Sequence, residues 1–302
     1  MDISTIVTQM LILVLLMFIG FIGAKINVFN DEINVAASNL LLKIGIPGLI
    51  ISSVKDGSPI TGKELFYTLI VFFVFMVFTG IVSKIIVEVA HIKENKPLWQ
   101  FMILFTNAGF IGLPAVQAIL GNKAMLYGAL FLLALNCLMY GYGENLFRKG
   151  GFSFKKFMNG PMIASLIALI LCILNLKLPY IIGKTCTYVG NMTTPLSMMV
   201  IGAGLVKMDI KELTDIKLWG FTIFKMILMP LFYIFILSFF HLDSLVENVI
   251  ILMMCMPVAS NASVYALMYK EDATLASKVI FMTSISCVVT IPFVFIVRNA
   301  LF

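Results

Sequence analysis

The 302-residue sequence has few charged residues, which make up 12% of the chain, whereas hydrophobic residues make up 61%. A water-soluble domain needs about a quarter charged residues to cover its surface, so a soluble fold is excluded. Closely spaced cysteine pairs are also missing, because the 5 cysteines are scattered in or beside apolar stretches. Neither a disulfide framework nor a zinc site is therefore indicated.

Signatures of enzymes and of nucleic-acid binding are absent as well. The sequence contains neither HExxH nor GxSxG, and Gly141-Tyr-Gly-Glu144 differs from the GxGD signature of intramembrane aspartyl proteases in its fourth residue. No basic stripe with interleaved aromatic residues occurs, so we expect no nucleic-acid partner. We predict that the chain is not an enzyme and carries no metal or other cofactor.

The apolar residues are grouped into long stretches that can each cross roughly 30 Å of hydrocarbon as a helix. We count ten of them, at residues 5–23, 33–54, 65–89, 98–119, 124–147, 158–177, 182–206, 217–240, 247–269 and 273–298. No Lys or Arg precedes the first stretch, so it is interpreted as a membrane span rather than a signal peptide. The prediction is an all-α integral membrane protein with ten transmembrane helices.

The basic residues are divided unequally between the two sides of the predicted membrane. Of the 21 Lys and Arg residues, Lys43 and Lys225 lie deep within spans, and 13 lie on the side where odd-numbered spans end and even-numbered spans begin, in the loops or near the span ends. The opposite side has six, namely Lys55, Lys63, Lys123, Lys177, Lys184 and Arg298. Since cytoplasmic loops carry the excess of Lys and Arg, we predict a cell-membrane protein with both termini outside.

The longest basic connection, residues 148–156 (RKGGFSFKK), divides the chain near its midpoint, with five predicted spans on each side. An odd number of spans per half makes the second half enter the membrane in the opposite orientation, which is the arithmetic of an inverted repeat. We therefore predict a first five-helix repeat at 1–147, a cytoplasmic linker at 148–157 and a second, inverted repeat at 158–302. This organisation is typical of secondary transporters.

Helix-breaking residues occur at matching positions in the fourth span of each half. Residues 107–114 and 256–263 are 149 positions apart, and each stretch contains an Asn and a Pro. Pro114 and Pro257 should free the carbonyls of Phe110 and Met253, which cannot face lipid. Such paired breaks indicate a central binding site, where half-helix ends present N–H groups to anions and free carbonyls to cations.

These residues resemble a known family, the bacterial auxin efflux carriers and other PIN-like permeases. The similar motifs are Asn107-Ala-Gly-Phe-Ile-Gly-Leu-Pro114, Leu120-Gly121, Asn136, Pro195 with Gly202-Ala-Gly204, and Met256-Pro-Val-Ala-Ser-Asn261. Their order and spacing extend over nearly the whole chain. The resemblance implies a ten-helix fold related to bile-acid/sodium symporters and sodium/proton antiporters, with spans 4 and 9 broken and crossing near the midplane.

The same resemblance carries functional implications. It implies transport of small organic anions such as dicarboxylates or auxin-like carboxylates by an elevator-type mechanism. Spans 1, 2, 6 and 7 would form a scaffold, and spans 3–5 and 8–10 would move as the transport unit. It also implies a homodimer formed through the scaffold helices. The alternative is an ion or solute channel or a membrane sensor, because broken helices can also line pores.

Eight residues are candidates for the substrate site. Asn107 and Asn261 can either cap a half-helix or contact a substrate carboxylate, and Asn136 can contact substrate or bond to an unwound part of span 4. Gly109, Pro114 and Pro257 belong to the two breaks.

The two lysines within spans complete this set. Lys43 lies near the bilayer centre, where a lysine costs roughly 2.5–3.5 kcal/mol, so it is expected either to bind the anion or to make a structural contact. Lys225 can attract the anion, although its position six residues after Trp219 also allows it to extend to the cytoplasmic interface.

The sequence leaves the coupling ion open. No Asp or His lies near a span centre, which disfavours a proton antiporter built on a pair of carboxylates. Hydroxyl and amide groups that could help to form a sodium site are Asn191, Thr193, Thr194, Ser197, Thr283, Ser284, Ser286 and Thr290. Such side chains are also common in helix packing, so sodium and proton coupling both stay open.

Overall fold

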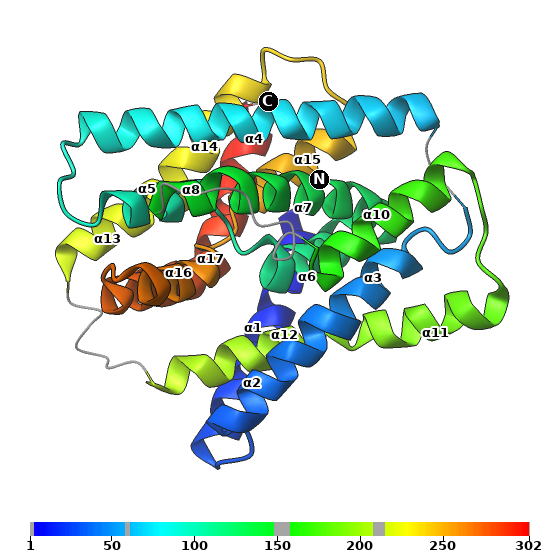
Figure 1. Cartoon of the computed structure of the whole chain (residues 1–302), viewed down its shortest axis with the longest axis horizontal. Helices are drawn as coiled ribbons and strands as arrows, with labels where there is room; N and C mark the ends of the chain where they lie inside the picture. The colour runs from blue at the N-terminus through cyan, green and yellow to red at the C-terminus, as the bar shows by residue number, and fades with distance from the viewer. Residues whose placement is uncertain (1–2, 58–60, 148–157, 208–214, 302) are drawn as a thin grey trace.

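The chain is a set of helices joined by short connections in a computed structural model that describes residues 3–57, 61–147, 158–207 and 215–301 (Figure 1). The helices before residue 148 are α1 (Ile3–Lys25), α2 (Asp31–Leu40), η1 (Leu41–Gly45), α3 (Ile46–Ser52), α4 (Gly62–Val89), α5 (Lys96–Leu104), η2 (Ala108–Gly112), α6 (Leu113–Ala115), η3 (Val116–Leu120), η4 (Asn122–Ala124), α7 (Met125–Leu138), η5 (Met139–Gly143) and α8 (Glu144–Phe147). Those after it are α10 (Gly160–Ile173), α11 (Tyr180–Asn191), α12 (Thr193–Gly204), η6 (Leu205–Lys207), α13 (Ile216–Ile223), η8 (Phe224–Leu228), α14 (Met229–Leu237), α15 (Ser244–Met254), α16 (Asn261–Tyr269) and α17 (Ala273–Leu301). The described residues form no strand, which confirms the all-helical prediction.

Six helical segments among the described residues are long and apolar enough to cross a membrane: Ile3–Lys25, Asp31–Ser52, Gly62–Val89, Asn122–Phe147, Ile216–Leu237 and Ala273–Leu301. The other four predicted spans form shorter helices. Residues 98–119 and 247–269 are interrupted, α10 has 14 residues, and residues 182–206 are divided at Met192 into α11 and α12. The predicted linker 148–157 lies outside the described residues, as does Lys211.

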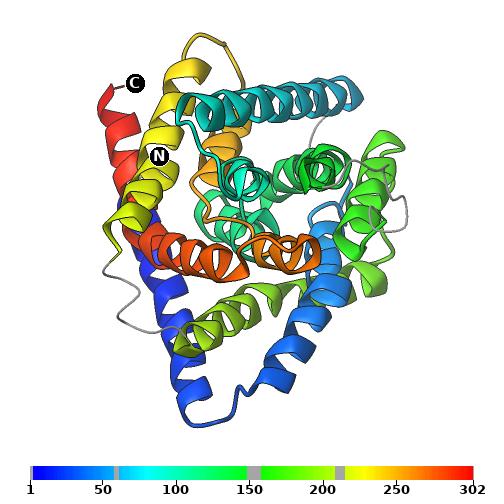
Figure 2. The same cartoon turned by 60° about the vertical axis from the view of Figure 1, so that its left-hand side comes forward.

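The helices of the predicted scaffold pack against one another. α1 lies along α12, and α3 packs against both α10 and α11. Figure 2 shows α1, α2 and α12 together at one side of the molecule, with α4 at the opposite side. The α1–α12 approach needs glycine, because a Cβ on Gly202 would lie 1.8 Å from the Met17 carbonyl oxygen. Small residues allow such close backbone contact between membrane helices.

A Gly202→Ala variant is expected to separate α1 from α12 and to lower the unfolding temperature in detergent. Overpacking of this kind costs about 1–3 kcal/mol. Gly204 is the matched control, because a Cβ there meets no atom within 4 Å. Scanning fluorimetry of both variants tests the contact, and equal unfolding temperatures for the two would contradict it.

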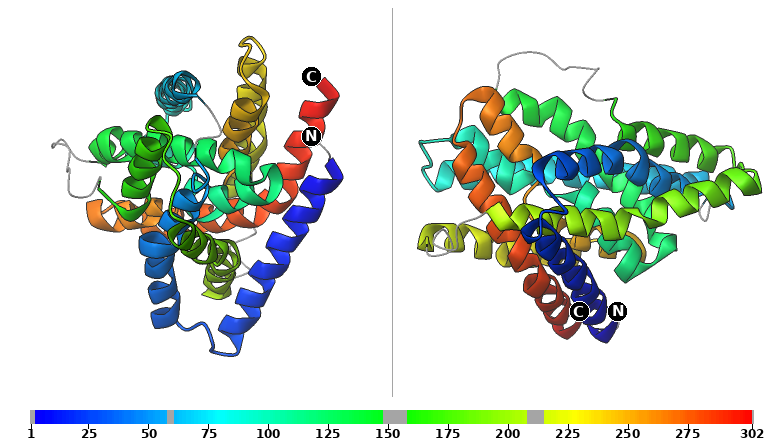
Figure 3. Two further views of the ribbon diagram at one scale, coloured as in Figure 1. Left: turned by 90° about the vertical axis from the view of Figure 1, so that its right-hand side faces the viewer. Right: turned by 90° about the horizontal axis from the view of Figure 1, so that it is seen from below.

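The remaining helices form a second group around α7. α4 packs along α7 and contacts α5, while α13, η8 and α14 contact α17. Large apolar side chains on the outer surfaces of α1 and α4 are exposed, among them Leu15, Phe66 and Val74. Such surfaces are compatible with lipid. α1 also contacts α17, and both views in Figure 3 place the two ends of the chain at the same end of the molecule.

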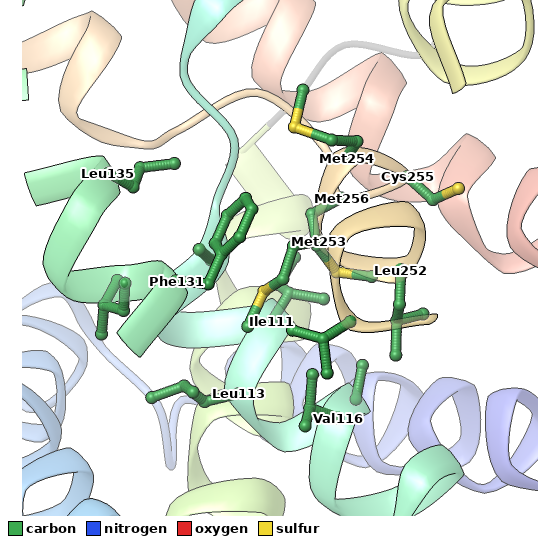
Figure 4. Close-up of a cluster of buried hydrophobic side chains, with 14 of the residues drawn as sticks. Ile111, Leu113, Val116, Phe131, Leu135, Leu252, Met253, Met254, Cys255 and Met256 are labelled. Carbon is green, nitrogen blue, oxygen red and sulfur yellow. The ribbon is translucent and has the colours of Figure 1, made fainter. Parts of the chain in front are cut away.

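An apolar cluster fixes the helix that runs from Ala108 to Leu120 against α15 and α7. Figure 4 shows Ile111 of this helix beside Met253 of α15 and Phe131 of α7. All three side chains are buried. A Cβ on Gly112 would lie 2.6 Å from the Met253 sulfur, so the backbone of this helix approaches α15 closely. The contact holds the two interrupted helices in one position relative to each other.

Candidate functional site

The two interrupted helices are joined through their unwound residues. α5 ends at Leu104 and the next helix begins at Ala108, while α15 ends at Met254 and α16 begins at Asn261. The Asn107 N–H donates to the Pro257 carbonyl (2.7 Å), and the Ala259 N–H donates to the Phe105 carbonyl (3.1 Å). Thr106 and Val258 thus form an antiparallel bridge. These two bonds satisfy backbone groups that the breaks release from the helices, as burial requires.

The unwound residues occupy only part of the stretches predicted as breaks. Residues 108–120 are helical. The π-helical turns η2 and η3, which are wider than α-helical turns, lie on either side of α6 and accommodate Pro114 without ending the helix. The expectation of a free Met253 carbonyl is wrong, because this oxygen accepts from the Met256 N–H (3.3 Å). The unwound residues are 105–107 in the first break and 255–260, around Pro257, in the second.

A cavity of about 390 Å³ lies beside the paired breaks. Its polar lining comes from both halves of the chain: Asn39, Lys43, Thr106, Asn107, Asn136, Tyr140, Asn159, Ser260 and Asn261. Among the eight sequence-predicted residues, the cavity brings together Lys43, Asn107, Gly109, Asn136 and Asn261. Pro114, Pro257 and Lys225 are not part of its lining.

Three helices begin at this cavity. The Asn107 side chain accepts a hydrogen bond from the Phe110 N–H (3.3 Å) at the start of η2, and the Asn159 side chain accepts from the Met162 N–H (3.0 Å) at the start of α10. α16 begins at Asn261, whose side chain instead contacts the Met139 sulfur (3.2 Å). Because helix N-termini carry partial positive charge and unpaired N–H groups, their convergence favours an anion.

Lys43 adds a full positive charge to the same cavity. It lies in the wide turn η1, which follows from the opening that Pro47 imposes on this helix, and its side chain is exposed. The start of α10 approaches it closely, since a Cβ on Gly160 would lie 2.6 Å from the Leu42 carbonyl oxygen. Among the described residues that line the cavity there is no Asp or Glu. Lys43 therefore meets no competing carboxylate among these lining residues.

Asn136 supplies an amide group from α7. Asn136 is only 8% exposed and lines the cavity, and its side chain forms no hydrogen bond within the described part of the chain. The sequence also allowed Asn136 to bond to the unwound part of span 4, but this hydrogen bond is not formed among the described residues. A buried amide of this kind can satisfy its donors and acceptor only with water or a bound molecule.

Lys225 lies neither at the cavity, where it could attract the anion, nor at the cytoplasmic interface. Its side chain is fully buried, and its Nζ donates to the Ile103 carbonyl (2.6 Å). The interpretation that Lys225 extends to the membrane interface is therefore wrong. It does not contact the cavity directly.

Sequence reasoning missed Asn159 as a site residue. Its local signal is present, because Asn159-Gly160-Pro161 has a capping residue followed by proline at the helix start. This signal identifies the start of α10, but it does not show that α10 begins beside the two breaks. That placement depends on the contacts of α10 with η1 and α7.

Comparison with known proteins agrees with this geometry. A family model described as membrane transport protein matches residues 5–156 and 149–295. An uncharacterized transporter from Methanocaldococcus jannaschii is 24% identical over 290 residues, covering 91% of this chain and 92% of its relative. These matches support a multi-pass membrane protein that acts as a transporter rather than an enzyme. The chain belongs to the membrane transport protein family, that of the auxin efflux carriers and PIN-like permeases.

Proposed function

We propose that this protein is a secondary transporter of small organic anions. The observation that supports it most directly is the cavity where three helix N-termini and the Lys43 ammonium converge on a lining without carboxylates. A second hollow of about 470 Å³ lies near the turn between α1 and α2, but Asp31 and Glu32 line it. That hollow is electrostatically unsuited to an anion.

The proposed substrate carries a carboxylate and a partly apolar body. Lys43 would pair with the carboxylate, while the amides of Asn107, Asn136 and Asn261 would hydrogen-bond it. Phe110 and Leu132 also line the cavity and offer apolar contact. Dicarboxylates and auxin-like carboxylates both contain these elements.

The proposed architecture is ten spans in a 5+5 inverted repeat, with the interrupted helices as spans 4 and 9. Spans 1, 2, 6 and 7 would be the scaffold, in line with the packing of α1 on α12 and of α3 on α10 and α11. The other six spans would carry the site across the membrane by an elevator-type movement. Homodimer formation through the scaffold is part of the same proposal.

The proposed orientation places both termini outside the cell membrane. Met139 and Asn159, which line the cavity, are close in sequence to the linker 148–157. The cation distribution assigns this linker to the cytoplasm. The conformation would accordingly be one in which the site faces inward.

Uptake and counterflow in proteoliposomes test the proposal. We expect saturable flux of at least one carboxylate from a panel of labelled mono- and dicarboxylates, with sodium and pH gradients imposed separately. The response to each gradient identifies the coupling ion. Absence of carboxylate flux together with a conductance in planar bilayers would contradict a carrier and favour a channel.

A further inference from the structure

The paired breaks leave the Ile103 carbonyl, at the end of α5, without its helical partner. In a regular helix the Ile103 carbonyl would accept from the Asn107 N–H, four residues later. That N–H instead donates to the Pro257 carbonyl (2.7 Å) on the other interrupted helix. A helix end buried among other helices needs another donor for such an oxygen, because an unsatisfied carbonyl there costs several kcal/mol.

Lys225 supplies that donor. Its Nζ lies 2.6 Å from the Ile103 oxygen, and the side chain is 0% exposed. Lys225 lies in the wide turn η8, between α13 and α14, and reaches α5 from a segment more than 100 residues away in sequence. The Nζ atom lies at the C-terminal end of α5, where the negative end of the helix dipole favours a positive charge on Lys225.

No carboxylate compensates this charge within the described part of the chain. The ion pairs described there are Lys55–Asp56, Lys96–Glu88 and Arg298–Glu247, and none includes Lys225. Lys225 therefore meets the end of α5 with no carboxylate partner among the described residues.

Free backbone carbonyls at broken membrane helices are groups that coordinate monovalent cations in transporters. We propose that Lys225 is a tethered cation, which holds the end of α5 at the crossing point in place of a bound inorganic cation. The packing of the two breaks would then need no sodium. The inference goes beyond the proposed function and does not depend on which anion is carried.

The test compares unfolding temperatures of the full-length protein in detergent. Wild type is expected to unfold at the same temperature in sodium chloride and in choline chloride at equal ionic strength. Lys225→Ala leaves the Ile103 carbonyl beside an empty space and should gain a response to sodium or methylammonium. A cation that binds only the folded state raises the unfolding temperature, by roughly 5 °C at about 100 times its dissociation constant.

Lys63→Ala is the matched control, because it removes an exposed lysine and should gain no such response. Stabilisation of wild type by sodium relative to choline would overturn the proposal, and this arm needs no variant to fold. Lys225→Ala that is recovered but gains no cation response would overturn it too. If Lys225→Ala cannot be purified, Lys225→Gly with methylammonium present during extraction replaces it.

Transport separates this inference from the proposed function. Replacing sodium by choline should leave any carboxylate flux of wild type unchanged at fixed pH, and loss of that flux would overturn the tethered cation. Absence of flux under all conditions would contradict the proposed anion carrier instead. The unfolding measurements would still decide the role of Lys225 in that case.

Discussion

Lys43→Glu is expected to abolish carboxylate uptake, with folding little affected. The Lys43 side chain is exposed to the cavity and takes part in none of the ion pairs of the described residues. Surface-like substitutions of this kind change stability by about 0.5 kcal/mol or less. A glutamate there would place negative charge among three helix N-termini and repel the substrate carboxylate.

A series of substitutions at Lys43 separates charge from shape. Lys43→Gln removes the charge and should raise KM at least about tenfold, because a charge-assisted hydrogen bond contributes roughly 1.5–3 kcal/mol. Lys43→Arg should retain measurable uptake, since the guanidinium also binds carboxylates. Uptake into proteoliposomes at matched protein density measures all three variants. Lys63→Glu is the control for a charge reversal far from the cavity.

The outcome for Lys43 bears on the whole site assignment. Wild-type KM and rate in Lys43→Glu, with normal membrane insertion, would remove the cavity as the anion site. Reduced rate in Lys63→Glu as well would indicate a general effect of net charge on the membrane surface. Only selective loss in the Lys43 series supports direct contact with the anion.

The helices were largely predictable because the membrane constrains them so strongly. An apolar stretch such as 65–89 must be helical to satisfy its backbone in hydrocarbon, and α4 (Gly62–Val89) agrees within a few residues. The capping box at Thr61 and Glu64 fixes the start of this helix, slightly before the apolar stretch. Local chemistry and bilayer thickness together determine such elements.

The breaks were only partly predictable. Matching Asn and Pro residues indicated two interrupted helices, but their local chemistry does not specify where unwinding occurs. The Asn107 N–H donates to the Pro257 carbonyl instead of to the Ile103 carbonyl, and the first break lies before Ala108. This choice depends on the approach of α15 to the first break, which no pattern within residues 98–119 encodes. The π-helical turns on either side accommodate Pro114 within the helix.

Lys43 and Lys225, the two lysines deep within predicted spans, also show that local sequence does not specify tertiary contacts. Both are basic residues in apolar stretches, and the sequence leaves open for each whether it attracts the anion or makes another contact. The structure separates their environments, because Lys43 faces the cavity whereas Lys225 is fully buried against the Ile103 carbonyl. Tertiary contacts, which determine the available partners, decide whether such a residue meets a ligand or the backbone.

Substitution of Asn107 is expected to have the second large effect on carboxylate uptake, because this residue belongs both to the first break and to the cavity lining. Its side-chain oxygen accepts from the Phe110 N–H at the start of η2, and its residue lines the cavity. Asn107→Asp keeps an oxygen for this cap and adds negative charge beside the proposed anion. We expect loss of uptake in Asn107→Asp together with an unfolding temperature close to that of wild type.

Asn107→Ala distinguishes capping from substrate contact. It removes both the cap and the amide, so we expect loss of uptake with normal membrane insertion, and a lower unfolding temperature. Loss of a capping side chain costs about 1 kcal/mol. A role in capping alone would make Asn107→Asp transport like wild type, whereas a role in anion contact makes it inactive and stable. Uptake and unfolding measured on the same preparations of both variants therefore decide between the two roles.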